Sequence, residues 1–453
     1  MMRTILLTIL WAASLEAADS FTVTSGPQPH QVLQRSKEGV AQTAFSGTAL
    51  VDGLLEGRVD KGGFSRLTTI KAGPWTAIGP PLKTGGPYAI ELRFTPKSGG
   101  RQVERMENLF VGDIYILSGQ SNMVGRARME NPETPHPKVK VFNMEGKWDI
   151  AKEPLHELTK GLNDVLRGTG LGLPFAKEMV RRNGVPIGLV PCAKGGTSMA
   201  QWDPGLKSEG RKALYGNMLA RFRDAGGKAA GLLWYQGESD AKPEAAAIFG
   251  EKFRKFVAEV RADFAQPDLP FYYAQIGRYA AAMEPAYEGW NQVQEAQRLA
   301  ESGIANVGMV STIDLELDDL IHANRASLQR LGVRFAKLVL DGAKPRFSAV
   351  KWDNPYQIRV EFQGVTGKLA TSGGRLTGFS LRNEVGQDLK IIYRAAIDPA
   401  SNSVVLYLIH QKPLPESLYL WYGQGLDPIC NLTDAADMAL PVMGPLKLPV
   451  QTH

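Results

Sequence analysis

The sequence predicts an α/β protein in which a parallel sheet forms the core and a β module lies on each side of it in the chain. Short apolar segments alternate with amphipathic helical patterns through 111–342, which is typical of βαβ units. Segments of period-two alternation, split by turn residues, occupy 18–110 and 343–453 and indicate antiparallel strands. The high counts of glycine (48) and proline (28) fit a chain with many turns.

The first residues have the layout of a secretory signal peptide. Arg3 precedes the apolar run Ile5–Ala13, and the small residues of Ser14–Ala18 offer a cleavage site. We therefore expect a signal peptide over 1–17 and a secreted or periplasmic protein; a buried N-terminal strand is the alternative. No later stretch reaches the ~20 apolar residues of a membrane helix, so we expect no membrane span.

The two β modules are predicted from alternating segments. Thr43–Gly47 and Tyr88–Phe94 represent the N-terminal module, and Gln357–Phe362 and Val404–Ile409 the C-terminal one. Their apolar residues recur at every second position, which places them on one face of a strand.

The middle of the chain alternates buried strands with helices. Because parallel strands are covered by helices on both faces, they are expected as continuous apolar runs. The predicted strands are Ile114–Leu117, Pro186–Val190, Gly231–Tyr235, Phe271–Ile276 and Val307–Ser311. The predicted helices are Phe175–Arg182, Ala245–Phe264, Gln292–Ala300 and Arg325–Val339.

Charge and cysteine content exclude several classes of function. The net charge of +6 is spread thinly, without basic clusters interleaved with aromatics, so we expect no nucleic-acid partner. The two cysteines, Cys192 and Cys430, do not make a disulfide framework; they either pair or are buried free thiols. Neither they nor the six histidines stand at metal-ligand spacing, so we expect no metal and no cofactor.

Polar and glycine residues follow the predicted strands one after another. Ser121 follows the first strand, Gly196 the second and Gln236 and Glu238 the third, while Asp319 and His322 lie beyond the fifth. Because ligands bind beyond the carboxyl ends of parallel strands, we expect these residues to meet at one edge of the sheet.

These residue types suit acyl transfer by a serine. His322 is the expected base, and Asp319, three residues earlier, is close enough to orient its ring. The backbone N–H groups of Ser121 and Gly196 and the amide of Gln236 are candidate oxyanion donors. Each signal alone is ordinary, since a serine after a strand is commonly a helix cap and Asp-x-x-His a helix start. Their joint placement favours the catalytic interpretation.

The motifs resemble the sialate O-acetylesterase family of SGNH-type hydrolases, which is related to the acetylesterases of carbohydrate esterase family six. The resemblance rests on Gly112–Met123, Trp234–Asp240 and Asp319–His322, and extends outward to pieces such as Val32–Arg35 and Leu376–Phe379. It implies a flavodoxin-like parallel core flanked by β-sandwich-like modules. By this resemblance, Ser121 is the nucleophile, His322 the base, Asp319 its orienting acid, Gly196 and Gln236 oxyanion donors, and Glu238 a supporting residue.

The expected activity is removal of O-acetyl groups from a sugar or glycan, with O-acetylated sialic acid favoured. Because sialate carries a carboxylate, Arg126 and Arg278 are candidate substrate-binding residues, and Trp202 is a candidate for stacking on a sugar ring. Xylan or another acetylated polysaccharide is the alternative substrate. A carbohydrate-binding protein with a vestigial esterase site is the alternative from another class. The sequence leaves the oligomeric state open.

Overall fold

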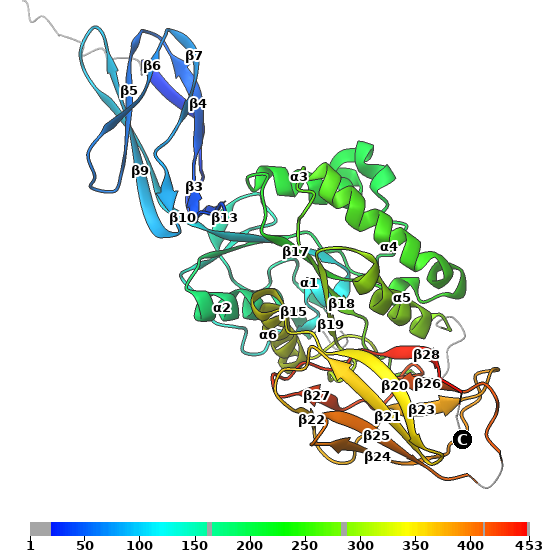
Figure 1. The fold of residues 1–453 in the computed structure, drawn as a ribbon. Coiled ribbons are helices and arrows are strands. Elements are labelled where there is room, and N and C mark those ends of the chain that lie inside the picture. Colours follow the sequence, from blue (N-terminus) through cyan, green and yellow to red (C-terminus); the bar gives the residue numbers. More distant parts are fainter. Residues whose placement is uncertain (1–19, 161–164, 282–287, 411–412, 451–453) are drawn as a thin grey trace, which may run out of the picture. The chain divides into compact units, whose positions relative to one another are not determined.

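The computed structural model describes residues 20–160, 165–281, 288–410 and 413–450 and has an α/β architecture with several sheets (Figure 1). The expected signal peptide, 1–17, lies outside the described residues. The chain divides into two compact units, one made of 1–28, 42–82 and 87–109, the other of 29–41, 83–86 and 110–453.

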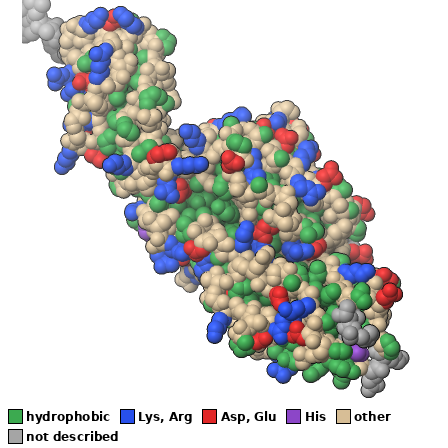
Figure 2. Space-filling model, in the orientation of Figure 1, with side chains coloured by type: hydrophobic (Ala, Val, Ile, Leu, Met, Phe, Trp, Pro, Cys, Tyr) green, Lys and Arg blue, Asp and Glu red, His purple; other side chains and the backbone are tan. Residues whose placement is uncertain are grey.

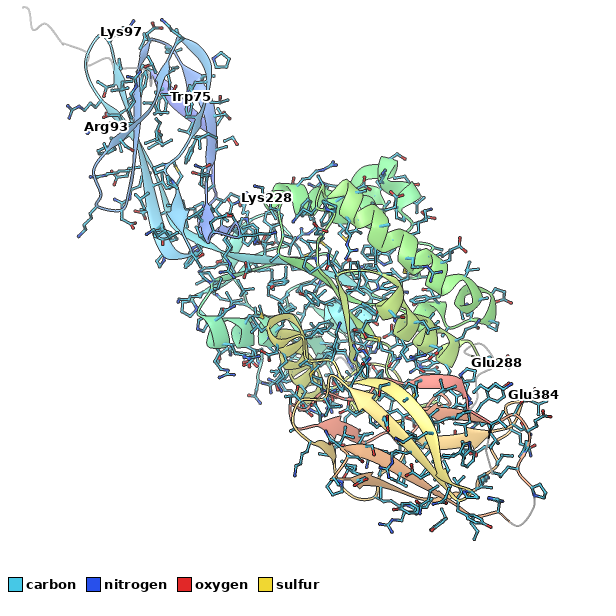
Figure 3. The ribbon with its side chains drawn as sticks, viewed as in Figure 1. Trp75, Arg93, Lys97, Lys228, Glu288 and Glu384 are labelled. Atoms are coloured by element: carbon cyan, nitrogen blue, oxygen red, sulfur yellow. The ribbon has the colours of Figure 1, made fainter. Side chains whose placement is uncertain are left out.

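The first unit is built of antiparallel strands. One sheet has the order β1-β4-β7, and in the other β5 pairs with β6 and β9. The ring of Phe21 stacks on Trp75 and Phe94 at centroid distances of 4.9 and 4.8 Å, so side chains of both sheets share one core (Figure 3 labels Trp75). The strands are β1 Phe21–Ser25, β4 Ala44–Ala49, β5 Gly53–Val59, β6 Ser65–Ile70, β7 Gly73–Ile78 and β9 Gly85–Pro96.

The second unit contains the central sheet, in the order β13-β12-β16-β10-β17-β18-β19. All neighbours from β12 to β19 are parallel, and only β13 at the edge is antiparallel. The strands are β10 Gln102–Gly119, β12 Val139–Phe142, β13 Trp148–Ile150, β16 Ile187–Pro191, β17 Gly231–Tyr235, β18 Phe271–Gln275 and β19 Val307–Ser311. The parallel sheet predicted from the apolar runs is therefore present.

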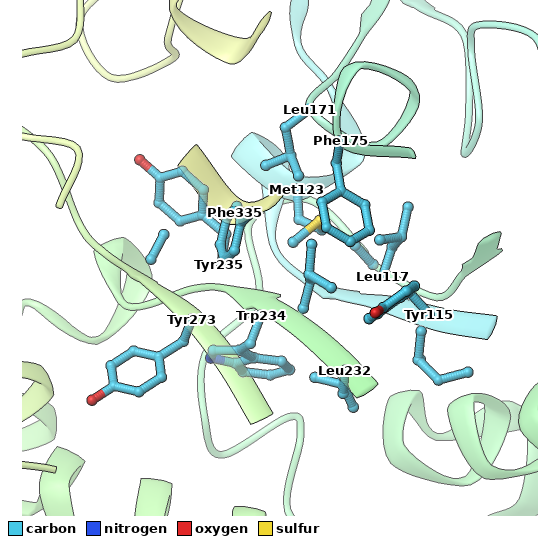
Figure 4. Packing of buried hydrophobic residues seen from close by; sticks show 14 of the residues in the cluster. Tyr115, Leu117, Met123, Leu171, Phe175, Leu232, Trp234, Tyr235, Tyr273 and Phe335 are labelled. Carbon is cyan, nitrogen blue, oxygen red and sulfur yellow. The ribbon is translucent and has the colours of Figure 1, made fainter. Parts of the chain in front are cut away.

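Helices cover both faces of this sheet (Figure 1). Their apolar faces pack on the strands. Phe175 of α2 meets the ring of Tyr115 edge-on (Figure 4). The ring centroids of Phe256 on α4 and Trp234 lie 4.5 Å apart. The helices are α2 Gly172–Asn183, α3 Leu214–Asp224, α4 Pro243–Asp263, α5 Trp290–Gly303 and α6 Arg325–Asp341. The four predicted helices correspond to α2, α4, α5 and α6.

Strand β12 and helix α3 were not predicted, because a buried cation interrupts the apolar pattern of each. Lys140 of β12 lies over the ring of Phe110, with its Nζ 4.4 Å from the centroid. Arg221 of α3 donates to the carbonyl oxygens of Pro191, Phe142 and Asn143. Tertiary partners thus make a polar residue part of the interior.

The C-terminal strands belong to the same compact unit as the central sheet. They form a four-stranded sheet, β20-β21-β25-β24, and smaller sheets around a second core that includes Ile358, Leu406 and Leu420. The strands are β20 Arg346–Asn354, β21 Gln357–Gln363, β22 Leu369–Thr371, β23 Phe379–Arg382, β24 Ile392–Asp398, β25 Ser403–Leu408, β26 Tyr419–Tyr422, β27 Leu432–Asp434 and β28 Met443–Lys447.

The predicted module boundary at 342 lies between α6 and β20 within the second unit, and the one at 110 lies next to the division between the two units. The boundary at 110 falls inside β10, and β2, Val32–Gln34, pairs with β10 in the second unit. The five remaining short strands among the described residues are β3 Val40–Ala41, β8 Leu82–Lys83, β11 Ala127–Arg128, β14 Thr159–Lys160 and β15 Leu166–Thr169.

Cys192 and Cys430 are both free and buried, so the alternative of buried thiols holds. Acidic and basic side chains are interspersed on the visible surface (Figure 2).

Candidate active site

The serine turn begins where β10 ends, in the middle of the central sheet. Gly119 has φ +131°, and a Cβ atom there would lie 2.2 Å from the carbonyl oxygen of Tyr235 on β17. Only glycine fits this close approach. The N–H of Gln120 donates to the same carbonyl at 2.8 Å, and Ser121 then opens the short helix α1, Ser121–Val124. The turn thus places Ser121 at the carboxyl edge of the sheet, 7 % exposed.

Asp319 and His322 form a hydrogen-bonded pair on the loop between β19 and α6. The Nδ1 atom of His322 lies 2.9 Å from Oδ2 and 3.0 Å from Oδ1 of Asp319. Oδ1 also accepts from the backbone N–H groups of Ile321 and His322. Partial burial opposes ionisation of Asp319, but these hydrogen bonds outweigh it and lower the pKa of the carboxyl well below its usual range. The ionised carboxylate favours the tautomer with the proton on Nδ1, which leaves Nε2 as the basic nitrogen.

Asn122, the residue after Ser121, connects the serine turn to this loop. Its Oδ1 accepts from the N–H of Ala323 at 3.1 Å, and its Nδ2 donates to the carbonyl of Ile321 at 3.3 Å. These are the residues on either side of His322. The side chain of Asn122 therefore fixes the backbone of the histidine relative to Ser121.

Glu238 lies behind Asn122. Its Oε1 accepts from Asn122 Nδ2 at 2.9 Å, while its Oε2 is buried and has no hydrogen-bond partner among the described residues. Burial raises the pKa of this carboxyl, although the bond from Asn122 opposes the shift. Glu238 thus contacts Asn122, and its role as a supporting residue stays a prediction.

The double glycine and Arg126 lie at the same edge. A Cβ atom on Gly195 would be 2.8 Å from Nη2 of Arg126 and 3.6 Å from Cβ of Ser121. Gly195 therefore lies between the guanidinium and the serine. Nε of Arg126 is buried without a hydrogen-bond partner among the described residues, and Glu157 lies 3.7 Å from Nη2. Gly196 has φ +70° and open space beside it.

Gln236 is fully buried and its amide nitrogen is already bonded. Nε2 donates to the carbonyl of Thr197 at 3.0 Å and to Asp240, whereas Oε1 has no partner among the described residues. In this arrangement Gln236 braces the loop after β16. Its assignment as an oxyanion donor stays a prediction.

Arg167 on β15 belongs to the site, although the sequence did not indicate it. Its Nη1 donates to Oδ2 of Asp319 at 3.2 Å and to the carbonyl of Arg126 at 2.9 Å. It thus connects the orienting carboxylate to the segment that follows the serine turn. Asn122 was visible inside the serine motif, but no local pattern distinguishes Arg167 from other arginines.

Two of the expected substrate-binding residues have structural partners instead. Trp202 is 0 % exposed; its Nε1 donates to Thr197 and its ring packs against Trp234 and Phe256, so it cannot stack on a sugar. Arg278 pairs with Glu316 at 2.9 Å and Asp427 at 2.8 Å. The prediction that Trp202 stacks on a sugar ring is wrong, because its ring packs in the core, to which a tryptophan is equally suited.

The described residues contain no cluster of histidine, cysteine and acidic side chains that would hold a metal ion. Among the helices described, none is long and apolar enough to cross a membrane.

Comparison with known proteins identifies the family of the segment that carries this site. The family model for carbohydrate esterase, sialic acid-specific acetylesterase, matches residues 111–341, which contain Ser121, Asp319 and His322. A probable carbohydrate esterase of Arabidopsis thaliana is 31 % identical over 251 residues, covering 50 % of this chain and 90 % of the relative.

Two further relatives are more distant. Human sialate O-acetylesterase is 24 % identical over 275 residues, which is 51 % of each chain, so this chain matches about half of that relative's length. The solved structure of a carbohydrate acetylesterase from Xanthomonas citri has a TM-score of 0.69 at 22 % identity, covering 92 % of this chain and 99 % of that one, and shows the shared fold.

The fold, the Asp319–His322 pair and these matches define a carboxylic ester hydrolase. The chain belongs to the family of carbohydrate esterases described as sialic acid-specific acetylesterases. Its class of substrate is therefore an O-acetylated sugar.

Proposed function

We propose that this protein is a serine esterase that removes O-acetyl groups from carbohydrate through an acetyl-enzyme intermediate. The proposal rests on the side chain of Asn122, the residue after Ser121. This side chain is hydrogen-bonded to the backbone of both neighbours of His322. Because Asp319 is hydrogen-bonded to Nδ1 of the same histidine, the segments that carry the proposed nucleophile, base and orienting acid are joined by hydrogen bonds.

The proposed reaction has two steps. In the first, Oγ of Ser121 attacks the acetyl carbonyl, His322 takes the hydroxyl proton, and that proton passes to the sugar oxygen as the ester bond breaks. In the second, His322 accepts a proton from water, the hydroxyl attacks the acetyl-enzyme, and acetate leaves as Ser121 regains its proton. The N–H groups of Ser121 and Gly196, with Gln236, are the proposed oxyanion donors.

We further propose that the substrate is O-acetylated sialic acid. Arg126 supports this choice, because its guanidinium lies beside Gly195 near Ser121 and its Nε has no hydrogen-bond partner among the described residues. A sugar carboxylate would suit this cation. Acetylxylan or another acetylated polysaccharide is the second candidate, and a neutral sugar would not use the charge of Arg126.

The finer fold assignment and the location of the protein are also proposals. The parallel sheet order β16-β10-β17-β18-β19 supports an SGNH-type, flavodoxin-like core, and the flanking antiparallel sheets support β-sandwich-like modules. The signal-like N-terminus supports export to the periplasm or the medium.

The decisive experiment is release of acetate from a panel of O-acetylated sialic acids, acetylated xylan oligomers and simple acetylated hexoses. We expect turnover by the wild type, greatest on sialic acids, and none above background for Ser121→Ala. Ser118→Ala is the matched control, because Ser118 is a buried serine of the same strand end whose Oγ has no hydrogen-bond partner among the described residues. A wild type that releases no acetate and reacts with no serine-directed phosphonate would leave the alternative of a carbohydrate-binding protein with a vestigial site.

A further inference from the structure

The loop that carries Asp319 and His322 is connected by ionic contacts to residues outside the central sheet. It runs from the end of β19 to the start of α6, over 312–324. Two sets of ionic contacts join it to the C-terminal strands, one through Asp437 and one through Asp427. No step of the proposed reaction uses these contacts.

The first set is centred on a buried ion pair, while Arg330 and Asp437 at its edge are 36 % and 44 % exposed. Arg334 of α6 binds Asp314, on the loop, through two hydrogen bonds of 2.7 Å, and the two side chains are 1 % and 2 % exposed. The carboxylate of Asp437 lies 3.2 Å from the same guanidinium and 2.6 Å from Arg330, which also bonds Asp314 at 3.0 Å. Because an uncompensated buried charge is strongly destabilising, the loop is fixed where this network stays complete.

The second set is closer to the catalytic pair. Nη2 of Arg278 binds Glu316 on the loop at 2.9 Å, and its Nη1 binds Asp427 at 2.8 Å. Two residues further along the chain, the N–H of Ala280 donates to the carbonyl of Leu320, between Asp319 and His322, at 2.8 Å. These ion pairs are more exposed than the pair of Arg334 and Asp314, so each contributes less than that pair.

The C-terminal region also contacts the central sheet directly through buried hydrogen bonds. Gln275, at the end of β18, donates to the carbonyl of Val442 at 2.9 Å and accepts from its N–H at 2.8 Å. The amide of Gln275 is fully buried, so this contact excludes water. Displacement of the C-terminal strands would therefore disturb the contacts of Asp437 and of Asp427 with their arginines.

We propose that the C-terminal strands position the catalytic loop, with Asp437 and Asp427 as the positioning residues and Arg278, Arg330 and Arg334 as the connections. The catalytic part of this inference rests on the proposed esterase function. Arg278 then orders the loop of the base instead of binding a substrate carboxylate. The C-terminal strands thus act on turnover of every substrate, small or polymeric.

The test compares the double variant Asp427→Asn/Asp437→Asn with the wild type. Asparagine keeps the size of each side chain and tolerates the left-handed backbone of Asp437, where φ is 60°. We expect kcat on a small chromogenic acetate ester to fall about 2- to 30-fold, with KM changed less than about twofold. Hydrogen exchange should become faster across 312–324.

The matched control is Asp398→Asn, which removes a carboxylate bonded to Arg359 within the four-stranded sheet β20-β21-β25-β24. We expect the kinetics and the exchange of 312–324 to match the wild type. The single variant Asp427→Asn, at a half-exposed side chain, replaces the double variant if the latter does not fold.

Unchanged exchange in 312–324, or a loss confined to KM on polymeric glycans, would overturn the positioning role. A wild type without acetate release would defeat the proposed function, whereas the exchange measurement would still report on the loop. The two failures are therefore distinguishable.

Discussion

Asn122 Nδ2 donates a 2.9 Å hydrogen bond to the buried Oε1 of Glu238. This bond fixes the orientation of an amide whose two ends also bind the neighbours of His322. The geometry of the proposed nucleophile and base therefore depends on a side chain that contacts neither the oxyanion nor the leaving group in the proposed mechanism. Four predictions follow from this and the adjoining contacts.

Replacement of Asn122 by alanine should lower kcat by about 100-fold with little change in KM, because the loop of His322 loses its connection to the serine turn. Steady-state kinetics on a small acetate ester measure this. Asn143→Ala, in a turn where the side chain accepts from Lys147 N–H, is the control and should match the wild type. A loss confined to KM would contradict the positioning of the base by Asn122.

Replacement of Asp319 by asparagine should lower kcat by about 1,000- to 10,000-fold, because the amide no longer favours the tautomer with a basic Nε2. The hydrogen bonds lower the pKa of Asp319, so its ionised form stabilises the folded protein above the unfolded-state value of about 3.9. The wild type should therefore unfold at a higher temperature than Asp319→Asn at neutral pH, and the difference should shrink progressively as the pH falls from that value toward the lower folded-state pKa. Thermal melts across pH 2–7 check this, and a pH-independent difference would argue against it.

Replacement of Glu238 by glutamine should raise the melting temperature at neutral pH, whereas replacement of Asp319 by asparagine should lower it. Burial raises the pKa of Glu238, so the stabilising form is the protonated one, and its contribution is lost as the pH rises through the folded-state pKa. Glutamine can still accept from Asn122, so Glu238→Gln should melt at a higher temperature than the wild type at neutral pH and at the same temperature in acid. Equal melting temperatures at neutral pH would indicate that Oε2 is compensated by a group such as water.

Replacement of Arg126 by glutamine should affect substrates according to their charge. We expect KM for an O-acetylated sialic acid to rise about 10-fold or more, as for the loss of a charge-assisted hydrogen bond, with neutral acetylated xylan oligomers unchanged. Arg128→Gln, two residues away and more exposed, is the control. An equal effect on both substrates would assign Arg126 to general site structure and favour the neutral glycan.

Features governed by local chemistry were accessible from the sequence. The apolar runs predicted β17 and β19 at their observed bounds, because a strand buried on both faces needs no partner information to be recognised. The predicted pairing of Asp319 with His322 is present, because a separation of three residues within one turn brings the two side chains together. The sequence by itself thus determined the parallel core and the candidate nucleophile, base and acid.

Only the tertiary structure decided what surrounds them. The partners of Asn122 and Arg167 come from loops far away in the chain, and no periodicity records such contacts. Trp202 lies in the core and Arg278 pairs with Asp427 of the C-terminal region. These contacts also join segments far apart in the chain, so the sequence pattern did not reveal them. A tryptophan or arginine suits a sugar site and an interior equally well, and packing alone determines whether water, a neighbouring ring or a carboxylate lies beside it.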